Sequence, residues 1–195
     1  MAITSGIFSS DAVFGNRWIR SLEELNALVA HLKGIGLRVV LTSGSFDLVH
    51  LGHVKYLARA KELGDVLVVG VDSDEKIRAR KGPERPLVPE DERLEMLAHQ
   101  RPVDLLYLKP SEDPRWALID AVRPDVLVLT TEHGYQADEV ERLRTACGRI
   151  ETVERQTSVT TSERIRQLYM HLGERLGPRL AEVLPDLIES MLRRP

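Results

Sequence analysis

Short, uninterrupted runs of apolar residues alternate along the chain with segments whose apolar positions recur every three or four residues. The runs are typical of strands buried on both faces of a sheet, and the segments are typical of amphipathic helices. A capping box at Ser21 to Glu24 opens the first such helix. The expected strands cover residues 37–42, 65–71, 103–108, 125–130 and 149–154. Because they alternate with helices, the pattern predicts an α/β fold, a doubly wound parallel sheet of Rossmann-like type.

The end of the chain has a different pattern. After Thr160 the sequence is helical to its last residues, with interruptions expected at Gly177-Pro178 and at Pro185. Its apolar positions form a stripe that must pack against the sheet or against a second subunit, and the frequency of symmetric pairing favours a homodimer. We therefore expect a domain of residues 1–167, followed by a C-terminal helical extension of residues 168–195.

The composition excludes several classes of function. The chain has 27 basic and 30 acidic residues and a formal net charge of −3, so it carries no overall basic field for binding nucleic acid. The single cysteine, Cys147, cannot form an internal disulfide and is a poor start for a zinc site. No segment approaches the roughly 20 apolar residues of a membrane span. We therefore expect a cytoplasmic protein without nucleic-acid or membrane partners.

The stretch GSFDLVHLGH, residues 44–53, follows the first long apolar run and carries the candidate chemistry. In an open α/β sheet, ligands bind beyond the carboxyl ends of the strands, and the first strand-to-helix turn is a favoured phosphate site. Gly44 would let the backbone approach a ligand, and the helix that begins near His53 would direct unpaired N–H groups toward it. The imidazoles of His50 and His53 could donate hydrogen bonds to phosphoryl oxygens. Histidines at this spacing also serve as metal ligands, helix caps or core groups.

Two motifs give the chain a resemblance to the cytidylyltransferase-like nucleotidyltransferases. The first, G-x-F-D-x-x-H-x-G-H, is matched at Gly44, Phe46, Asp47, His50, Gly52 and His53. The second, R-T-x-G-I-S-T-S/T-x-x-I, is similar to RQTSVTTSERI, with Arg155, Val159, Thr160, Thr161, Ser162 and Ile165 in register. Between them, residues 70–98 are similar to the sugar-phosphate and glycerol-phosphate branches of the family, and the resemblance spans about Arg20 to Leu168.

The resemblance implies an enzyme that joins a nucleoside triphosphate to a small phosphorylated alcohol, sugar or related phosphate or phosphonate, and releases pyrophosphate. His50, His53, Lys81 and Arg155 would carry the catalysis by positioning and by neutralising charge. Mg²⁺ is expected as the companion of the triphosphate, with no ligand from the protein. The residues that the resemblance places on the nucleotide are Gly44, Ser45, Phe46, His50, His53, Arg155, Thr160, Thr161 and Ser162.

Other residues near this expected site are candidate substrate ligands with an alternative interpretation. Asp47 could orient a histidine or cap the following helix. Arg93 could bind the substrate phosphate or lie on the outer face of an amphipathic helix. His133 lies where many relatives have a glycine-rich string, and it could contact the acceptor or simply form a turn. The identity of the acceptor stays open.

The second motif also bears on the choice of nucleotide. RQTSVTTS looks more like the form of the cytidylyl members than the shorter G-C-S-T-T form of the heptose adenylyl branch, which favours transfer of CMP from CTP. Residues 70–98 are similar to both branches, so ATP-dependent transfer to a sugar phosphate such as heptose 1-phosphate is the alternative. A third hypothesis is a non-catalytic nucleotide-binding regulator, against which both histidines and Lys81 argue.

Overall fold

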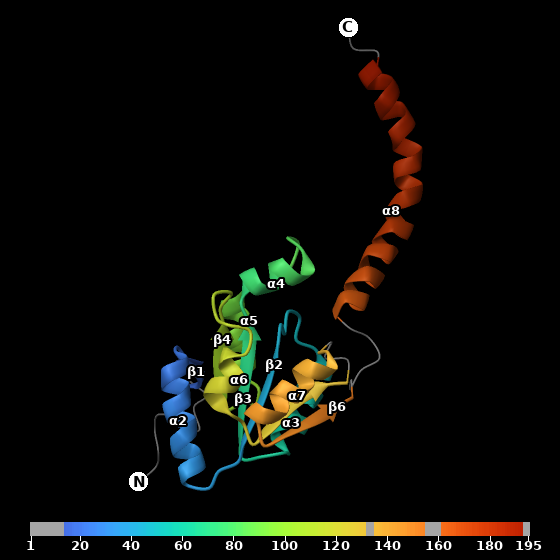
Figure 1. Ribbon diagram of the computed structural model, residues 1–195. Helices are drawn as coiled ribbons and strands as arrows, with labels where there is room; N and C mark the ends of the chain where they lie inside the picture. Colours follow the sequence, from blue (N-terminus) through green and yellow to red (C-terminus); the bar gives the residue numbers. More distant parts are fainter. Residues whose placement is uncertain (1–13, 132–134, 155–160, 193–195) are drawn as a thin grey trace. The chain divides into compact units, whose positions relative to one another are not determined.

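A parallel sheet of six strands, in the order β1-β4-β3-β2-β5-β6, forms the centre of the computed structural model (Figure 1). All of the strands expected from the apolar runs are present, which confirms the doubly wound α/β fold. β1 was not expected, because two residues are too short to show a periodicity. The strands are β1 (Trp18–Ile19), β2 (Val39–Gly44), β3 (Val66–Asp72), β4 (Leu105–Lys109), β5 (Val126–Thr130) and β6 (Arg149–Val153).

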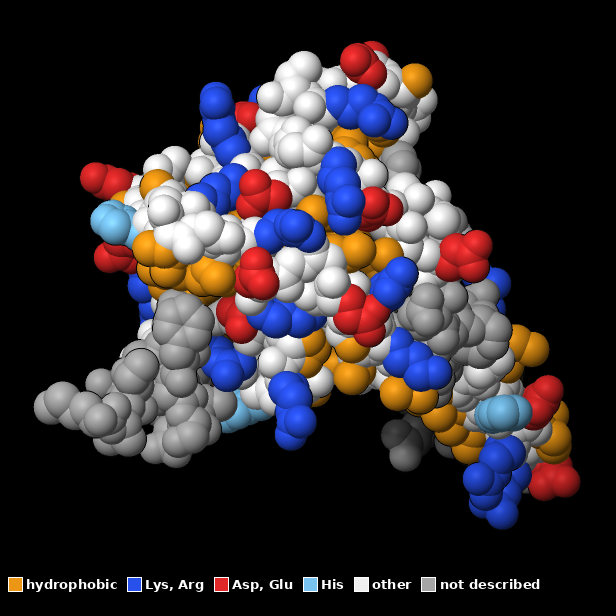
Figure 2. Space-filling model, turned by 90° about the horizontal axis from the view of Figure 1, so that it is seen from below, with side chains coloured by type: hydrophobic (Ala, Val, Ile, Leu, Met, Phe, Trp, Pro, Cys, Tyr) orange, Lys and Arg blue, Asp and Glu red, His pale blue; other side chains and the backbone are white. Residues whose placement is uncertain are grey.

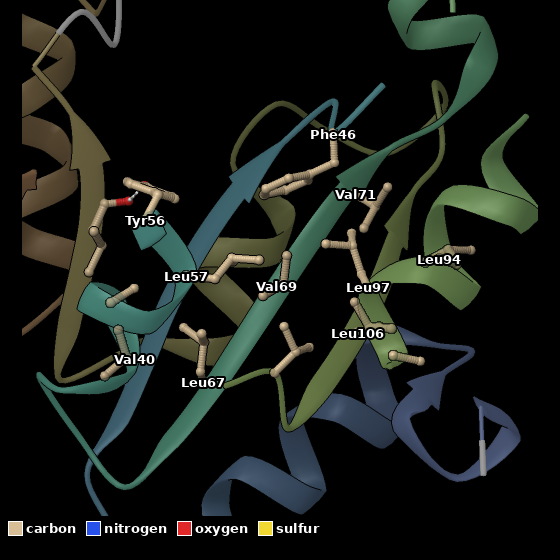
Figure 3. Packing of buried hydrophobic residues seen from close by; sticks show 14 of the residues in the cluster. Val40, Phe46, Tyr56, Leu57, Leu67, Val69, Val71, Leu94, Leu97 and Leu106 are labelled. Atoms are coloured by element: carbon tan, nitrogen blue, oxygen red, sulfur yellow. Dashed lines mark hydrogen bonds between the residues drawn. The ribbon is translucent and has the colours of Figure 1, made fainter. Parts of the chain in front are cut away.

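Helices cover both faces of this sheet, because successive strand residues point to opposite sides. On one face, α3 and α5 pack on β2, β3 and β4, and Figure 3 shows Leu57 and Leu97 among the strand valines and leucines there. On the other face, α2, α6 and α7 contribute the buried residues Leu25, Leu118 and Leu143. The helices before the last are α1 (Phe14–Arg17), α2 (Leu22–Gly34), α3 (Leu51–Lys61), α4 (Asp74–Lys81), α5 (Glu90–Ala98), α6 (Ala117–Val122) and α7 (Ala137–Ala146).

The structure describes residues 14–131, 135–154 and 161–192, with the backbone alone at Phe14, 161–164 and 186–192. The chain divides into two units, Met1–Gln156, which contains the sheet, and Thr157–Pro195. The expected domain boundary at residue 168 falls inside the last helix.

That last helix, α8, spans Thr161–Leu192 without a break, so the interruptions expected at its prolines are wrong. The helix continues through Pro178 and Pro185, whose φ angle is compatible with a helix, although each lacks a backbone donor and its ring crowds the carbonyl four residues before it. Apolar side chains from Leu168 to Leu184 are exposed on this helix. Within the described residues, no helix combines the length and the apolar character that crossing a membrane would require.

The order of the strands places the carboxyl end of β2 at the point where the sheet changes direction. From β2 the chain adds β3 and β4 on one side and then returns to add β5 and β6 on the other. Ligands of open α/β sheets bind at this point, so the turn after Gly44 lies where a site is expected. The opposite, lower end of the molecule has Lys, Arg, Asp and Glu side chains mixed over its surface (Figure 2).

Candidate active site

The turn that follows β2 has a backbone conformation that its side chains explain. Phe46 has a φ of 46°, a left-handed value that is costly for a residue other than glycine. Its ring is only 4% exposed and packs into the apolar cluster below the turn, as Figure 3 shows, and this burial holds the conformation. A Cβ on Gly44 would lie 3.2 Å from Cε2 of that ring, so a larger residue there would press on the ring of Phe46.

His50 and His53 are held by the first turn of α3. His50 is the N-cap residue, and its Nδ1 accepts a hydrogen bond from the Gly52 backbone N–H at 3.1 Å. The backbone N–H of His50 donates in return to Nδ1 of His53 at 3.4 Å. The two rings lie 4.1 Å apart between centroids. Because Nδ1 of His50 accepts, its neutral ring carries the proton on Nε2, where it can serve a ligand.

Burial makes His53 unlike an ordinary histidine. Its pKa falls from 6.5 to about 4, chiefly because burial disfavours the charged ring and secondarily because His50 lies beside it. A hydrogen bond with the backbone of Leu48 opposes this shift of the pKa without reversing it. His53 is therefore neutral at physiological pH, and any approaching anion meets a hydrogen-bonding group rather than a fixed positive charge.

Lys81, the last residue of α4, supplies positive charge beside the turn. Its Nζ donates to the Ser45 hydroxyl at 3.0 Å, although the two residues are 36 positions apart. Partial burial lowers the pKa of Lys81, and the neighbouring Arg80 and Arg85 lower it further. The structure thus brings together the turn, the histidine pair and Lys81, as the motifs predict.

Asp47 is buried below the turn and anchors the loop between α4 and α5. Its Oδ1 accepts from the backbone N–H groups of Leu87 and Val88, at 2.7 and 3.1 Å, and Arg85 forms an ion pair with its Oδ2. The alternative that Asp47 caps the next helix is wrong, because His50 occupies the cap position. Its carboxylate instead connects the first motif to the loop at 82–89.

Arg93 is fully buried, so the alternative that it lies on the outer face of an amphipathic helix is wrong. Its Nε donates to the Val88 carbonyl at 3.0 Å, and its terminal nitrogens donate to the Ser45 carbonyl and to Asp74 Oδ1, at 2.5 and 2.8 Å. The guanidinium therefore supports the turn from beneath, and its role as a direct phosphate ligand stays a prediction.

Several residues of the predicted site cannot be placed in this way. Arg155, Thr160 and His133 lie outside the described residues, and the side chains of Thr161 and Ser162 at the start of α8 do as well. The roles that the second motif assigns to them remain predictions.

Sequence reasoning missed a group of charged residues at the ends of β3 and β4. Asp72 and Lys109 are paired in register on these strands, and Arg80 joins them from α4. The signal was available, because both Asp72 and Lys109 end an apolar run at the edge where ligands bind.

Comparison with known proteins matches residues 41–175 to the model of the cytidylyltransferase-like family. The chain belongs to this family. The bifunctional protein HldE of Geobacter sulfurreducens is 38% identical over 163 residues, which cover 82% of this chain and 33% of that protein. The bifunctional protein HldE of Syntrophotalea carbinolica is 41% identical over 155 residues, which cover 77% of this chain and 31% of that protein. The chain thus spans about a third of the length of these relatives.

Two solved structures have a similar fold. A lipopolysaccharide core biosynthesis protein from Thermoplasma volcanium is 30% identical, with a TM-score of 0.52, and the match covers 63% of this chain and 98% of that one. A pantoate–beta-alanine ligase from Francisella tularensis, at 13% identity and a TM-score of 0.54 over 72% of this chain and 67% of that one, shares the fold.

Proposed function

We propose that this chain is a nucleotidyltransferase that transfers a nucleotidyl group from a nucleoside triphosphate to the phosphate of a small acceptor, with release of pyrophosphate. The observation that supports it is the histidine pair on the first turn of α3, next to Lys81 and to the turn that follows β2. A helix start, two imidazoles and an ammonium group form a set of donors suited to the oxygens of phosphate groups.

The reaction requires little covalent chemistry from these residues. An oxygen of the acceptor phosphate forms a bond to the α-phosphorus, and the bond from that phosphorus to the bridging oxygen breaks, so that the electron pair leaves with pyrophosphate. The attacking oxygen is already ionised, so no general base is needed. His50 and His53 would donate to oxygens whose charge grows in the transition state, and Lys81 would offset the charge of the leaving group.

The acids near the turn do not fit a resident divalent cation. Asp47 is occupied by two backbone donors and Arg85, and Asp72 is occupied by Lys109 and Arg80. Magnesium ligands are oxygens that can turn to an octahedral ion, which these engaged carboxylates cannot readily supply. We propose Mg²⁺ only as part of the nucleotide substrate, bound to the triphosphate oxygens.

ATP and a sugar phosphate, such as heptose 1-phosphate, are the first candidate substrates. The relatives named HldE support this choice, because their similarity extends over 77–82% of this chain. Residues 70–98 are similar to both branches of the family and do not distinguish ATP from CTP. CTP is the second candidate, and the form of RQTSVTTS at 155–162 supports it.

A screen of pyrophosphate release tests the proposal. The purified chain would be combined with Mg²⁺, with ATP or CTP, and with heptose 1-phosphate, glycerol 3-phosphate or other sugar phosphates in turn. We expect release with one combination and loss of that release in His53→Gln, but not in His31→Gln, since His31 is exposed on α2. Nucleotide binding without release from any combination would favour the regulator and contradict the enzyme.

A further inference from the structure

Asp72, at the carboxyl end of β3, is a buried carboxylate surrounded by cations. It is only 3% exposed, and its two oxygens pair with different partners: Oδ1 with Lys109 Nζ at 3.1 Å and Oδ2 with Arg80 at 2.9 Å. Burial opposes ionisation of this carboxyl, but Lys109 and Arg80 overcome it and hold its pKa below the usual value. The charged form is therefore maintained inside the edge of the sheet.

Lys109 reaches this position by crossing over β3. A Cβ on Gly70 would lie closest to Leu118 Cδ2 and 2.9 Å from Lys109 Cδ, so the leucine and the lysine stem together fill the space above the glycine. Its side chain is 17% exposed, whereas that of Arg80 is 58% exposed. The Lys109 side chain is thus held against the sheet, and the Arg80 side chain remains accessible to solvent at the edge of the sheet.

A third cation increases the positive charge. The Lys76 ammonium donates to the Pro110 carbonyl at 3.3 Å, and its pKa is lowered by burial and then by Lys109. The other carboxylate that acts on Lys76 is Asp113, which accepts a hydrogen bond from the Tyr107 hydroxyl at 2.7 Å. Three cations, Lys76, Arg80 and Lys109, thus surround two carboxylates, Asp72 and Asp113, and a bound anion would offset the excess positive charge.

The group lies directly beside the phosphate-binding turn. In the sheet, Gly44 pairs with Val71 and Asp72 pairs with Lys109, so these residues end three adjacent strands at the same level. Neighbouring strands are about 4.8 Å apart, so at this level the backbone of Asp72 lies about 5 Å from β2 and that of Lys109 about 10 Å from it.

The last two residues of α4, Arg80 and Lys81, point to different strand ends. Lys81 donates to Ser45, on the side of the turn, and Arg80 pairs with Asp72, on the side of β3. Two polyanions that meet in one reaction repel each other, and cations on both sides of the contact offset this repulsion. Adjacent residues of α4 can therefore serve the two substrates separately.

We propose that Lys109, Arg80 and Lys76 bind the phosphate monoester of the acceptor, and that Asp72 positions them for it. The inference rests on the proposed function and adds the residues that select a phosphorylated acceptor. Asp72 holds Lys109 and Arg80 in place when no acceptor is bound. On binding, the phosphate dianion takes up the unbalanced charge, next to the triphosphate that it attacks.

Kinetic analysis of Lys109→Met and Arg80→Met tests this assignment. Methionine keeps an apolar stem over Gly70 and removes the charge. Each substitution should raise the KM for the acceptor about 10- to 100-fold, as expected for a lost charged hydrogen bond, and should change the KM for the nucleotide less than about 3-fold. Asp72→Asn, which loosens both cations, should also raise the acceptor KM and should weaken competitive inhibition by inorganic phosphate.

Lys61→Met is the matched control, because Lys61 pairs with Asp104 before β4, at the opposite end of the strands. It should leave both KM values unchanged. An unchanged acceptor KM in Lys109→Met and Arg80→Met, or a rise in the nucleotide KM alone, overturns the inference. Arg80 is exposed enough that its variant should fold even if Lys109→Met does not.

The proposed function and this inference can fail separately. A wild-type chain that releases no pyrophosphate contradicts the proposed function. Calorimetric titration with inorganic phosphate then tests whether Lys109, Arg80 and Lys76 bind a phosphate. Weaker phosphate binding by Lys109→Met than by Lys61→Met supports it, and equal binding refutes it.

Discussion

Replacing Arg93 by methionine should destabilise the fold more than any substitution of an exposed arginine. The guanidinium has no exposed surface and holds Asp74, the Ser45 carbonyl and the Val88 carbonyl. Methionine fills much of the same space but leaves these three acceptors without their donor. Removing one partner from a buried ion pair costs about 3–5 kcal/mol.

The structure places the expected loss at the lower end of this range. The Asp74 side chain is 19% exposed, and Arg78 lies 3.5 Å away, so the stranded carboxylate keeps some water and one cation. We therefore expect the free energy of unfolding to fall by about 3 kcal/mol. Urea unfolding at pH 7 measures it, provided that the slope of the transition does not change between variants.

Arg59→Met is the control for this experiment. Arg59 also pairs with a carboxylate, Glu62, but both side chains are more than half exposed, at 58% and 61%. The control should lose no more than about 0.5 kcal/mol. If Arg93→Met unfolds within about 1 kcal/mol of the wild type, the reasoning is refuted. If it also raises the acceptor KM, the interpretation of Arg93 as a phosphate ligand is favoured instead.

As the pH falls from 7 to 4, the unfolded state protonates its His53, with a pKa of 6.5, before the folded state does, with a pKa of about 4. Between these pH values the free energy of unfolding of the wild type should therefore fall by about 3 kcal/mol more than that of His53→Gln. Urea unfolding at several pH values measures this difference, and an equal pH dependence of the two free energies would contradict it. Removing either imidazole should lower turnover about 100- to 1000-fold with little change in melting temperature, and near-normal turnover in His53→Ala would exclude its role. Calorimetry with Mg²⁺ should show tighter binding of ATP than of CTP. Tighter binding of CTP would contradict this and would favour transfer of CMP from CTP, as the second motif predicts. The exposed apolar stripe from Leu168 to Leu184 predicts a homodimer in light scattering at micromolar concentration, and a monomer mass would refute it.

Local sequence determined the strands and the histidine pair. A buried strand needs only its own run of apolar side chains, so residues 66–72 and 126–130 could be recognised without their partners. His50 and His53 meet because residues three apart lie on the same side of a helical turn. The backbone N–H groups that orient them come from the same turn, so their capping geometry also depends on nearby residues alone.

Only the tertiary structure determined the burial and the partners of Asp47, Asp72 and Arg93. Each is a charged residue whose position follows from partners distant in the sequence: Asp47 bonds to residues 40 and 41 positions away, Asp72 pairs with Lys109, 37 positions away, and Arg93 donates to Ser45, 48 positions away. A charged side chain can be buried only when the fold places a counterion and hydrogen-bond partners beside it. A local sequence pattern does not show which distant residues these partners are. The spacing of a motif therefore predicts which residues face a ligand, whereas the packing of separate strands and helices determines which charges support them from beneath.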